Sequence, residues 1–369
     1  MPVKIQEDCY YFNGDIPCQP HKKYGVHCFD RKGNPCTYYQ KSGKKILIIK
    51  LGAIGDVIRT TPLLRKIREI YPHAVIWFLT YTPEVVPTSM VNHVLGFELS
   101  SIVVLEALDF DIVYNLDKDK EACALMKRVK GSRKIGFGLN SFGKCCPLNT
   151  NAEYRWSIGL FDDFSRTNQK TYQEQIFELC GLEYSGEKYV LDRSYTSKVF
   201  PIIDRSRYVI GINTGAGNRW QYKKWGVEGF IELITRIKTH FSNSEIILLG
   251  GPAEEERNLY IQSKVNNRVK YFGVLPLSDY IGLVGHCNAV ITSDSLTLHI
   301  AIGLDKKIIV YFGPTPHSEI ELYGLGKKVY SNLSCLGCFK QKCDLIPNCM
   351  DLITPNQMFE AVKEVVELK

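Results

Sequence analysis

The sequence predicts an α/β protein with two doubly wound parallel sheets in tandem, and three observations support this. Short apolar runs alternate with helical patterns from Lys45 onward. The alternation breaks between 149 and 206, where aromatic and charged residues crowd irregularly, and then starts again. The length of 369 residues suffices for two cores. Strands alternating with helices favour a parallel sheet covered on both faces, so we expect a ligand cleft where the carboxyl ends of two such sheets face each other.

In the first half, the run at 45–50 predicts a strand, LGAIGD a turn, and 57–70 one helix with an apolar side. A further helix is predicted in the irregular middle, at 171–182. The other elements expected here are strands at 74–80, 101–107, 110–117 and 133–139 and a helix at 120–129.

In the second half, strands and helices alternate in the same way, and the amphipathic stretch at 356–369 predicts a last helix. The predicted strands are 208–213, 245–251, 269–274, 288–294 and 307–313, and the helices are 227–241, 254–265, 276–285 and 295–304.

Composition places the chain among ordinary globular proteins, with 45% hydrophobic and 23% charged residues. The N-terminus has no signal-peptide pattern, and no apolar run is long enough to span a bilayer, so we expect a cytosolic protein. The 46 Lys and Arg exceed the 39 Asp and Glu by seven. This surplus suits anionic partners such as a phosphorylated glycolipid, an acidic membrane face or nucleic acid, although solvated basic surfaces explain it equally well.

Thirteen cysteines are many for a cytosolic chain, and eight of them form two groups. Clustered thiols in a reducing compartment indicate metal before disulfides, and a structural Zn or Fe site is expected at each group, with free or redox-labile thiols as the alternative. The C-terminal group follows the spacing C-x2-C-x4-C-x5-C, and the N-terminal group has longer gaps and contains two histidines, His21 and His27. The groups are Cys335, Cys338, Cys343 and Cys349, and Cys9, Cys18, Cys28 and Cys36.

The first of three strand-to-helix turns that carry chemistry is Gly52-Ala53-Ile54-Gly55-Asp56. Two glycines, Gly52 and Gly55, let the main chain pass close to a ligand, and Asp56 opens the following helix. The simpler interpretation makes Asp56 only a helix cap.

The second turn runs from Asn213 through Thr214 and Gly215 to Asn218 and Arg219, and Lys223 and Lys224 follow it. Small residues, a hydroxyl and nearby cations are what a diphosphate needs, although the turn matches neither the P-loop nor the dinucleotide fingerprint.

The third turn is Thr292-Ser293-Asp294-Ser295, which enters a helix carrying His299. Ser295 and His299 are four residues apart and share a helix face near its positive end, which suits phosphate and sugar hydroxyls. A buried histidine with a capping Asp or Ser is the alternative.

These motifs, together with LGGPAEEE and FGPT, stand in the order typical of glycosyltransferase family nine, the ADP-heptose:lipopolysaccharide heptosyltransferases, and the chain resembles that family from Lys45 to Thr315. The resemblance implies a GT-B fold. It implies an acceptor domain at 45–200 and a nucleotide-sugar domain at 201–350 that includes the Cys-rich segment 335–349. The sequence adds a C-terminal helix at 351–369 and a Cys-rich arm at 1–44, and this arm is absent from the best-known heptosyltransferases and leaves the acceptor open.

By the same resemblance, the family's catalytic Asp falls on Asp56, and its donor-binding residues fall on Thr214, Lys223 or Lys224, Glu254, Asp294, Ser295 and His299. The implied donor is ADP-heptose, and the implied acceptor is an anionic glycan or glycolipid at the cytoplasmic face of the inner membrane, with no nucleic acid partner. One departure from the family pattern is Leu296, which stands where the family has Gly.

An inverting transfer needs a base for the acceptor hydroxyl and a stabilised leaving group, and it requires no metal cofactor when protein cations neutralise the diphosphate. We therefore expect Asp56 to act as the base. Two alternatives remain at this point: a nucleotide-sugar epimerase of the same architecture, and a non-catalytic binding protein held together by metal.

Overall fold

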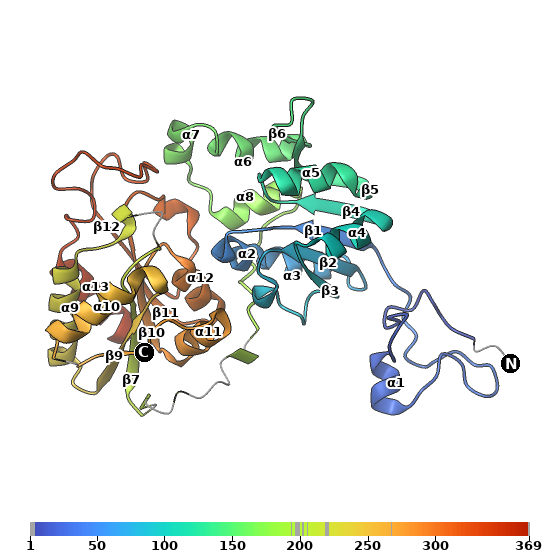
Figure 1. Cartoon of the computed structure of the whole chain (residues 1–369), viewed down its shortest axis with the longest axis horizontal. Helices are drawn as coiled ribbons and strands as arrows, with labels where there is room; N and C mark the ends of the chain where they lie inside the picture. The colour runs from blue at the N-terminus through green and yellow to red at the C-terminus, as the bar shows by residue number, and fades with distance from the viewer. Residues whose placement is uncertain are drawn as a thin grey trace. The chain divides into compact units, whose positions relative to one another are not determined.

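The computed structural model describes residues 4–192, 194–195, 200, 203–204, 206–217, 221–266 and 268–367. They form two compact units, each with its own sheet (Figure 1). The first unit is Met1–Leu51, Leu63–Pro83 and Thr88–Thr150, and the second is Gly52–Pro62, Glu84–Pro87 and Asn151–Lys369. The segment that carries Asp56 therefore clusters with the second unit.

The first sheet has the strand order β3-β2-β1-β4-β5-β6, in which β6 is antiparallel to β5 and the other neighbours are parallel. Its central strand β1 buries the four residues Ile46 to Ile49, as expected where helices cover both faces of a sheet. Apolar side chains of α4 and α5 pack with β1 and β4 in one core. The strands are β1 Lys45–Ile49, β2 Val75–Thr80, β3 His93–Gly96, β4 Asp109–Asn115, β5 Lys130–Leu139 and β6 Cys145–Pro147.

The second sheet is entirely parallel, with the order β12-β11-β10-β7-β8-β9. When β7 to β12 are numbered 1 to 6 and the sheet is read from the β9 edge, the strand order is 3-2-1-4-5-6, as in doubly wound nucleotide-binding folds. The predicted fold class is therefore confirmed. Helices α9, α10 and α13 lie on one face, and α11 and α12 lie on the other (Figure 1). The strands are β7 Tyr208–Asn213, β8 Ser244–Leu249, β9 Lys270–Tyr271, β10 Ala289–Ser293, β11 Lys307–Phe312 and β12 Gly326–Tyr330.

The helices follow the predicted pattern in most places, and the predicted last helix, α13, packs on α9, β11 and β12. The α-helices are α1 Gln19–Tyr24, α2 Ile54–Thr60, α3 Pro62–Ile70, α4 Leu99–Ala107, α5 Lys120–Arg128, α6 Glu153–Ile158, α7 Asp162–Thr167, α8 Tyr172–Leu179, α9 Val227–His240, α10 Glu255–Lys264, α11 Leu277–His286, α12 Leu296–Gly303 and α13 Pro355–Glu367. Short 3-10 helices are η1 Pro83–Val85, η2 Thr150–Ala152, η4 Gln221–Lys223, η5 Pro252–Glu254 and η6 His317–Glu319.

Two predicted elements were wrong. The predicted strand at 101–107 belongs to helix α4, because Ser101 and Leu105, four residues apart, share the buried face while Val103 and Val104 face solvent. Packing on one helical face outweighs the strand propensity of the valines. The predicted single helix at 57–70 is two helices, since Pro62 begins α3 at a position where its missing N–H costs least.

Strands β3, β6 and β12 were not predicted. Both β3 and β6 are short and only half-buried, and β12 carries Lys327 and Lys328, so none shows a continuous apolar run. Within the described ranges, no helix is long and apolar enough to cross a membrane.

Candidate active site

A cavity of 370 Å³, here called the Glu254 pocket, lies at the carboxyl edge of the second sheet, where the loops after β7 and β8 meet the start of α12. The carboxyl edge at the centre of a doubly wound sheet is where such folds bind nucleotides. The pocket is lined by Asn213, Gly215, Ala216, Gly217, Gly250, Gly251, Glu254, Leu275, Leu277, Tyr280, Ser295, Leu296 and Thr297.

The carboxylate of Glu254 is held on two sides. Its Oε1 accepts a hydrogen bond from the Gly217 N–H at 3.0 Å, and its Oε2 accepts one from the Gly251 N–H at 3.1 Å. The Lys224 ammonium lies 3.8 Å from Oε1. A Cβ on Gly215 would lie 2.4 Å from the same oxygen, so only glycine lets the loop pass this close to the carboxylate.

Thr214 does not line the Glu254 pocket; it is fully buried, and its hydroxyl donates to Asn258 Oδ1 at 2.6 Å. The polar groups that line the pocket nearby are Asn213 and Ser295, whose side chains are hydrogen bonded at 3.0 Å. This bond fixes the Ser295 hydroxyl at the start of α12. Asn218 and Arg219, which complete the second sequence motif, lie outside the described residues.

A second cavity of 480 Å³, here called the Asp56 pocket, adjoins the first, because Ser295 and Leu296 line both. All its lining residues belong to the second compact unit. They are Ala53, Ile54, Gly55, Asp56, Arg59, Lys223, Asp294, Ser295, Leu296, His299, Thr315, Pro316, Glu319, Ile320 and Phe339.

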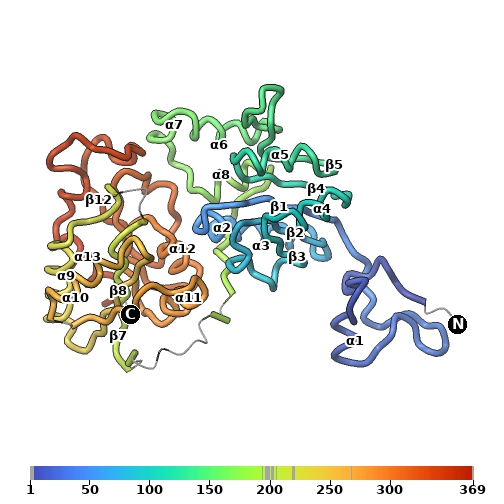
Figure 2. Tube along the Cα trace, viewed as in Figure 1, coloured from blue at the N-terminus to red at the C-terminus, as the bar shows by residue number. Residues whose placement is uncertain are grey.

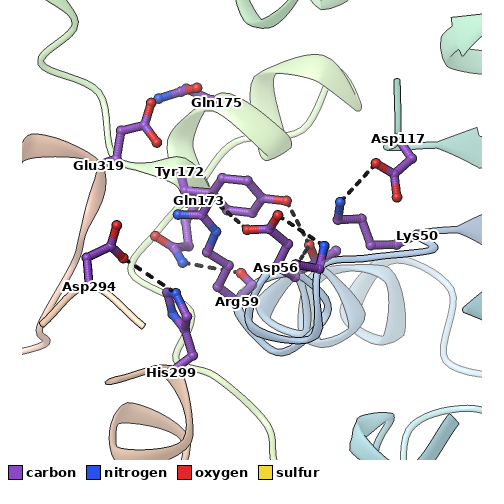
Figure 3. A network of polar contacts seen from close by, with 12 residues as sticks. Lys50, Asp56, Arg59, Asp117, Tyr172, Gln173, Gln175, Asp294, His299 and Glu319 are labelled. Atoms are coloured by element: carbon purple, nitrogen blue, oxygen red, sulfur yellow. Dashed lines mark hydrogen bonds and ion pairs between the residues drawn. The ribbon is translucent and has the colours of Figure 1, made fainter. Parts of the chain in front are cut away.

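Asp56 lies in the first turn of α2, where its Oδ2 accepts a hydrogen bond from the N–H of the capping residue Ala53 at 3.3 Å. Its Oδ1 lies 2.8 Å from Nη2 of Arg59, and the carboxylate is about one third exposed, at 32% (Figure 3). Asp56 thus lines the pocket, and the N-cap of α2 is Ala53, so the interpretation of Asp56 as only an N-cap was wrong.

Arg59 is the central cation of this pocket, and the sequence analysis missed it. Its guanidinium carbon lies 3.7 Å from the centre of the Tyr172 ring, in cation–π range, and its side chain is only 12% exposed (Figure 3). Burial alone would lower the pKa of Arg59, but Asp56, with smaller contributions from Tyr172, Glu319 and Tyr189, outweighs it, so the pKa is raised. Asp56 and Arg59 are three residues apart in sequence, so an acid–base pair on one helical face is the signal that could have identified it.

Lys223 and Asp294 form the second ion pair of the Asp56 pocket. The Lys223 ammonium donates to Asp294 Oδ2 at 2.8 Å and to the Asp294 carbonyl at 3.2 Å. Burial would raise the pKa of the Asp294 carboxyl, but Lys223, His299 and Arg59 together outweigh burial and lower it, so Asp294 stays ionised. Of the two lysines named from sequence, Lys223 faces this pocket, whereas Lys224 pairs with Glu254.

His299 is buried on α12, with Nε2 4.0 Å from Asp294 Oδ1 (Figure 3). Its Nδ1 lies 3.4 Å from the Tyr189 hydroxyl. Burial lowers the pKa of His299 to about 4, and the positive charge of Arg59 lowers it too, against the opposite effect of Asp294. The imidazole is therefore neutral near pH 7, when it can form hydrogen bonds but carries no charge.

Gly55 is where α2 and α12 touch. A Cβ at this position would lie 2.5 Å from Cδ2 of His299, so the glycine makes room for the imidazole. Gly52 lies outside the lining of the Asp56 pocket.

In the first unit, the loop that follows β1 begins at a buried ion pair that the sequence analysis did not predict. Lys50 Nζ lies 3.2 Å from Asp117 Oδ1, and Asp117 Oδ2 accepts the Leu51 N–H at 2.7 Å. These contacts join the end of β1 to the segment after β4.

The C-terminal cysteine group lies in the loop between β12 and α13, with Cys349 buried. Burial, and then the nearby thiols of Cys338, Cys343 and Cys335, raise the pKa of Cys349 to about 11, so the four sulfurs lie within electrostatic range of one another. In the described part of the chain, no three His, Cys, Asp or Glu side chains have the spacing of metal ligands. A metal at this group remains a prediction.

Residues 101–347 match the sequence profile of glycosyltransferase family 9 (heptosyltransferase). Lipooligosaccharide heptosyltransferase 2 of Campylobacter jejuni is 25% identical over 173 residues, which are 44% of this chain and 53% of that protein. The chain thus spans about half the length of that relative. Lipopolysaccharide core heptosyltransferase OpsX of Haemophilus influenzae is 25% identical over 282 residues, which are 71% of this chain and 77% of that protein.

Among solved structures, the ADP-heptose lipopolysaccharide heptosyltransferase II of Escherichia coli has a TM-score of 0.64 and 18% identity, and the match covers 88% of this chain and 98% of that chain. This likeness confirms the GT-B fold class, with two Rossmann-like domains. Because the family profile covers more than half of the sequence, the chain belongs to glycosyltransferase family 9 (heptosyltransferase).

Proposed function

We propose that this chain transfers heptose from a nucleoside diphosphate sugar, with ADP-heptose favoured, to an acceptor of the lipopolysaccharide-core type, with inversion at the anomeric carbon. The observation that carries the proposal is the continuity of two pockets. The Asp56 pocket contains a carboxylate, a paired lysine and a neutral imidazole, and it meets the Glu254 pocket at Ser295 and Leu296.

In this scheme the nucleoside occupies the Glu254 pocket. The Glu254 carboxylate can accept hydrogen bonds from ribose hydroxyls, and the glycines of the loops after β7 and β8 give the ligand access to backbone N–H groups. The diphosphate crosses at Ser295, where the N-terminus of α12 favours negative charge. The sugar then enters the Asp56 pocket.

Asp56 acts as the base. As the bond from the anomeric carbon to the diphosphate oxygen breaks, the acceptor oxygen forms its bond to the opposite face of that carbon, and Asp56 takes the hydroxyl proton. Arg59 Nη2 lies 2.8 Å from Asp56 Oδ1 and holds the carboxylate in place for this proton transfer.

The leaving nucleoside diphosphate takes the bonding electrons. Lys223 and the N-terminus of α12 neutralise it, and Asp294 holds the lysine in place, so this scheme requires no metal cofactor. The acceptor is anionic, which suits the net charge of +7, and we place the reaction at the cytoplasmic face of the inner membrane.

Replacement of Asp56 by Asn tests the assignment. Asp56→Asn should lower turnover about 100-fold or more, because it removes the proton acceptor, while thermal stabilisation by ADP changes little. Asp162→Asn, the same change at an exposed position at the start of α7, is the matched control and should keep full activity.

Full turnover by Asp56→Asn would refute the role of Asp56. Incubation of the donor without acceptor distinguishes the transferase from the remaining alternative, a nucleotide-sugar epimerase. An epimerase would isomerise the sugar, whereas a transferase at most hydrolyses the donor slowly.

A further inference from the structure

The N-terminal arm, residues 4–44, has a defined backbone but no hydrophobic core. It contains one short helix, α1, and two isolated β-bridges, Cys9 with Lys41 and Phe29 with Pro35 (Figure 2). Among the described residues of the arm, Pro20 is the only buried one. Segments of about 40 residues without a core usually need disulfides or a metal to hold one conformation.

The arm is instead arranged around a cavity of 580 Å³. All four thiols and both imidazoles of the arm line it: Cys9, Cys18, His21, His27, Cys28 and Cys36. Thiolate and imidazole are the ligands that zinc prefers in structural sites. The four cysteines of the expected group therefore line one cavity despite their long gaps in sequence.

The backbone brings these side chains together from three places. Cys18 is the capping residue of α1. Cys28 and Cys36 lie opposite each other in a hairpin, where the Cys36 N–H donates to the Cys28 carbonyl at 2.9 Å. Cys9 lies in a turn, with its N–H donating to the Gln6 carbonyl at 3.1 Å.

Two hydrogen bonds hold side chains that line the cavity. The Tyr38 N–H donates to the sulfur of Cys36 at 3.4 Å. His21 Nδ1 lies 2.9 Å from the Val26 carbonyl and donates to it. This bond fixes the orientation of the His21 ring among the residues that line the cavity.

We infer that the arm is a structural zinc module in which the thiols of Cys9, Cys18, Cys28 and Cys36 bind one Zn²⁺ tetrahedrally. Each thiol releases its proton to solvent as its sulfur–zinc bond forms. No three such side chains in the described arm are yet spaced as metal ligands, so the sulfurs must turn inward on binding, and the cavity leaves room for that rotation. The free energy of zinc binding would then supply the stability that the missing core does not.

The test uses the full chain, purified under reducing conditions, with its metal content measured by plasma mass spectrometry. The double variant Cys28→Ser/Cys36→Ser should lose one equivalent of zinc relative to wild type. Cys146→Ser, the same change at a thiol outside both groups, should lose none. The double variant Cys335→Ser/Cys338→Ser distinguishes metal bound by the C-terminal group from metal bound by the arm, and it should leave the arm's zinc in place.

Limited proteolysis gives a second readout that does not depend on transferase activity. Bonds within residues 4–44 should resist cleavage in the zinc-loaded wild type, and should become sensitive both after chelation and in Cys28→Ser/Cys36→Ser. Unchanged zinc content in that variant would overturn the inference, as would iron in place of zinc, or disulfides among the four arm cysteines in the reduced protein.

Discussion

The stability of the second unit should fall between neutral and mildly acidic pH because of one buried imidazole. The pKa of His299 is about 4 in the folded chain, against an ordinary value of 6.5. Between these values the unfolded chain binds a proton that the folded chain excludes, so folding loses stability as pH decreases. The stability that the chain keeps because His299 is neutral is fully present above pH 6.5 and is lost as the pH falls toward 4.

The size of the effect follows from the shift. A difference of one pKa unit corresponds to about 1.4 kcal/mol, so lowering the pH from about 7.5 to about 4.5 should cost the wild type roughly 2 to 3 kcal/mol through His299. The side chain is only 6% exposed, so solvent screens little of this. Asp294 stays ionised over the interval, because its lowered pKa lies below it.

The assay is urea unfolding at several pH values, followed by tryptophan fluorescence, since Trp225 is buried in the core of the same unit. His299→Gln removes the titration but leaves every other group, so the difference between the two proteins isolates His299. The variant's unfolding free energy should depend less on pH, by about 2 to 3 kcal/mol over the interval. Equal pH dependence in both proteins would show that the folded chain protonates His299 as readily as the unfolded one, and would refute the reasoning.

Substitutions at three further positions follow from the Asp56 pocket. Gly55→Ala should destabilise the chain by about 1 to 3 kcal/mol, because the new Cβ meets His299, and an unchanged melting temperature would mean that the imidazole moves aside freely. Arg59→Gln removes the partner of Asp56, so it should lower kcat and should lower the free energy of unfolding by roughly 2 kcal/mol. Arg59→Lys keeps the positive charge and should retain part of the wild-type kcat and part of the wild-type stability. A wild-type kcat in Arg59→Gln would contradict this role. Leu296→Gly widens the junction of the two pockets, so kcat/KM for ADP-heptose relative to ADP-glucose should rise about 10-fold, and an unchanged ratio would exclude Leu296 as a determinant of donor choice.

Much of the fold could be predicted because its signal is local. The buried strands β1, β7, β10 and β11 are short apolar runs, and the helices between them show their periodicity in the sequence alone. The failures occurred where local preference and packing disagree. The valines of α4 favour a strand, but a helix buries Ser101 and Leu105 together, and β12 has two lysines in place of an apolar run.

The sequence alone named Asp56, Lys223, Glu254, Asp294 and His299 as candidate site residues, and all five line the two pockets at the carboxyl edge of the second sheet, where a doubly wound sheet binds its ligands. Only the tertiary structure decided which of these groups neutralise one another. It pairs Lys223 with Asp294 and Lys224 with Glu254, turns Thr214 into the core, and adds Arg59 beside Asp56. The sequence shows which residue types a turn contains. The protonation of these residues depends on distance, burial and neighbouring charge, and these are set only when the loops pack in the folded chain.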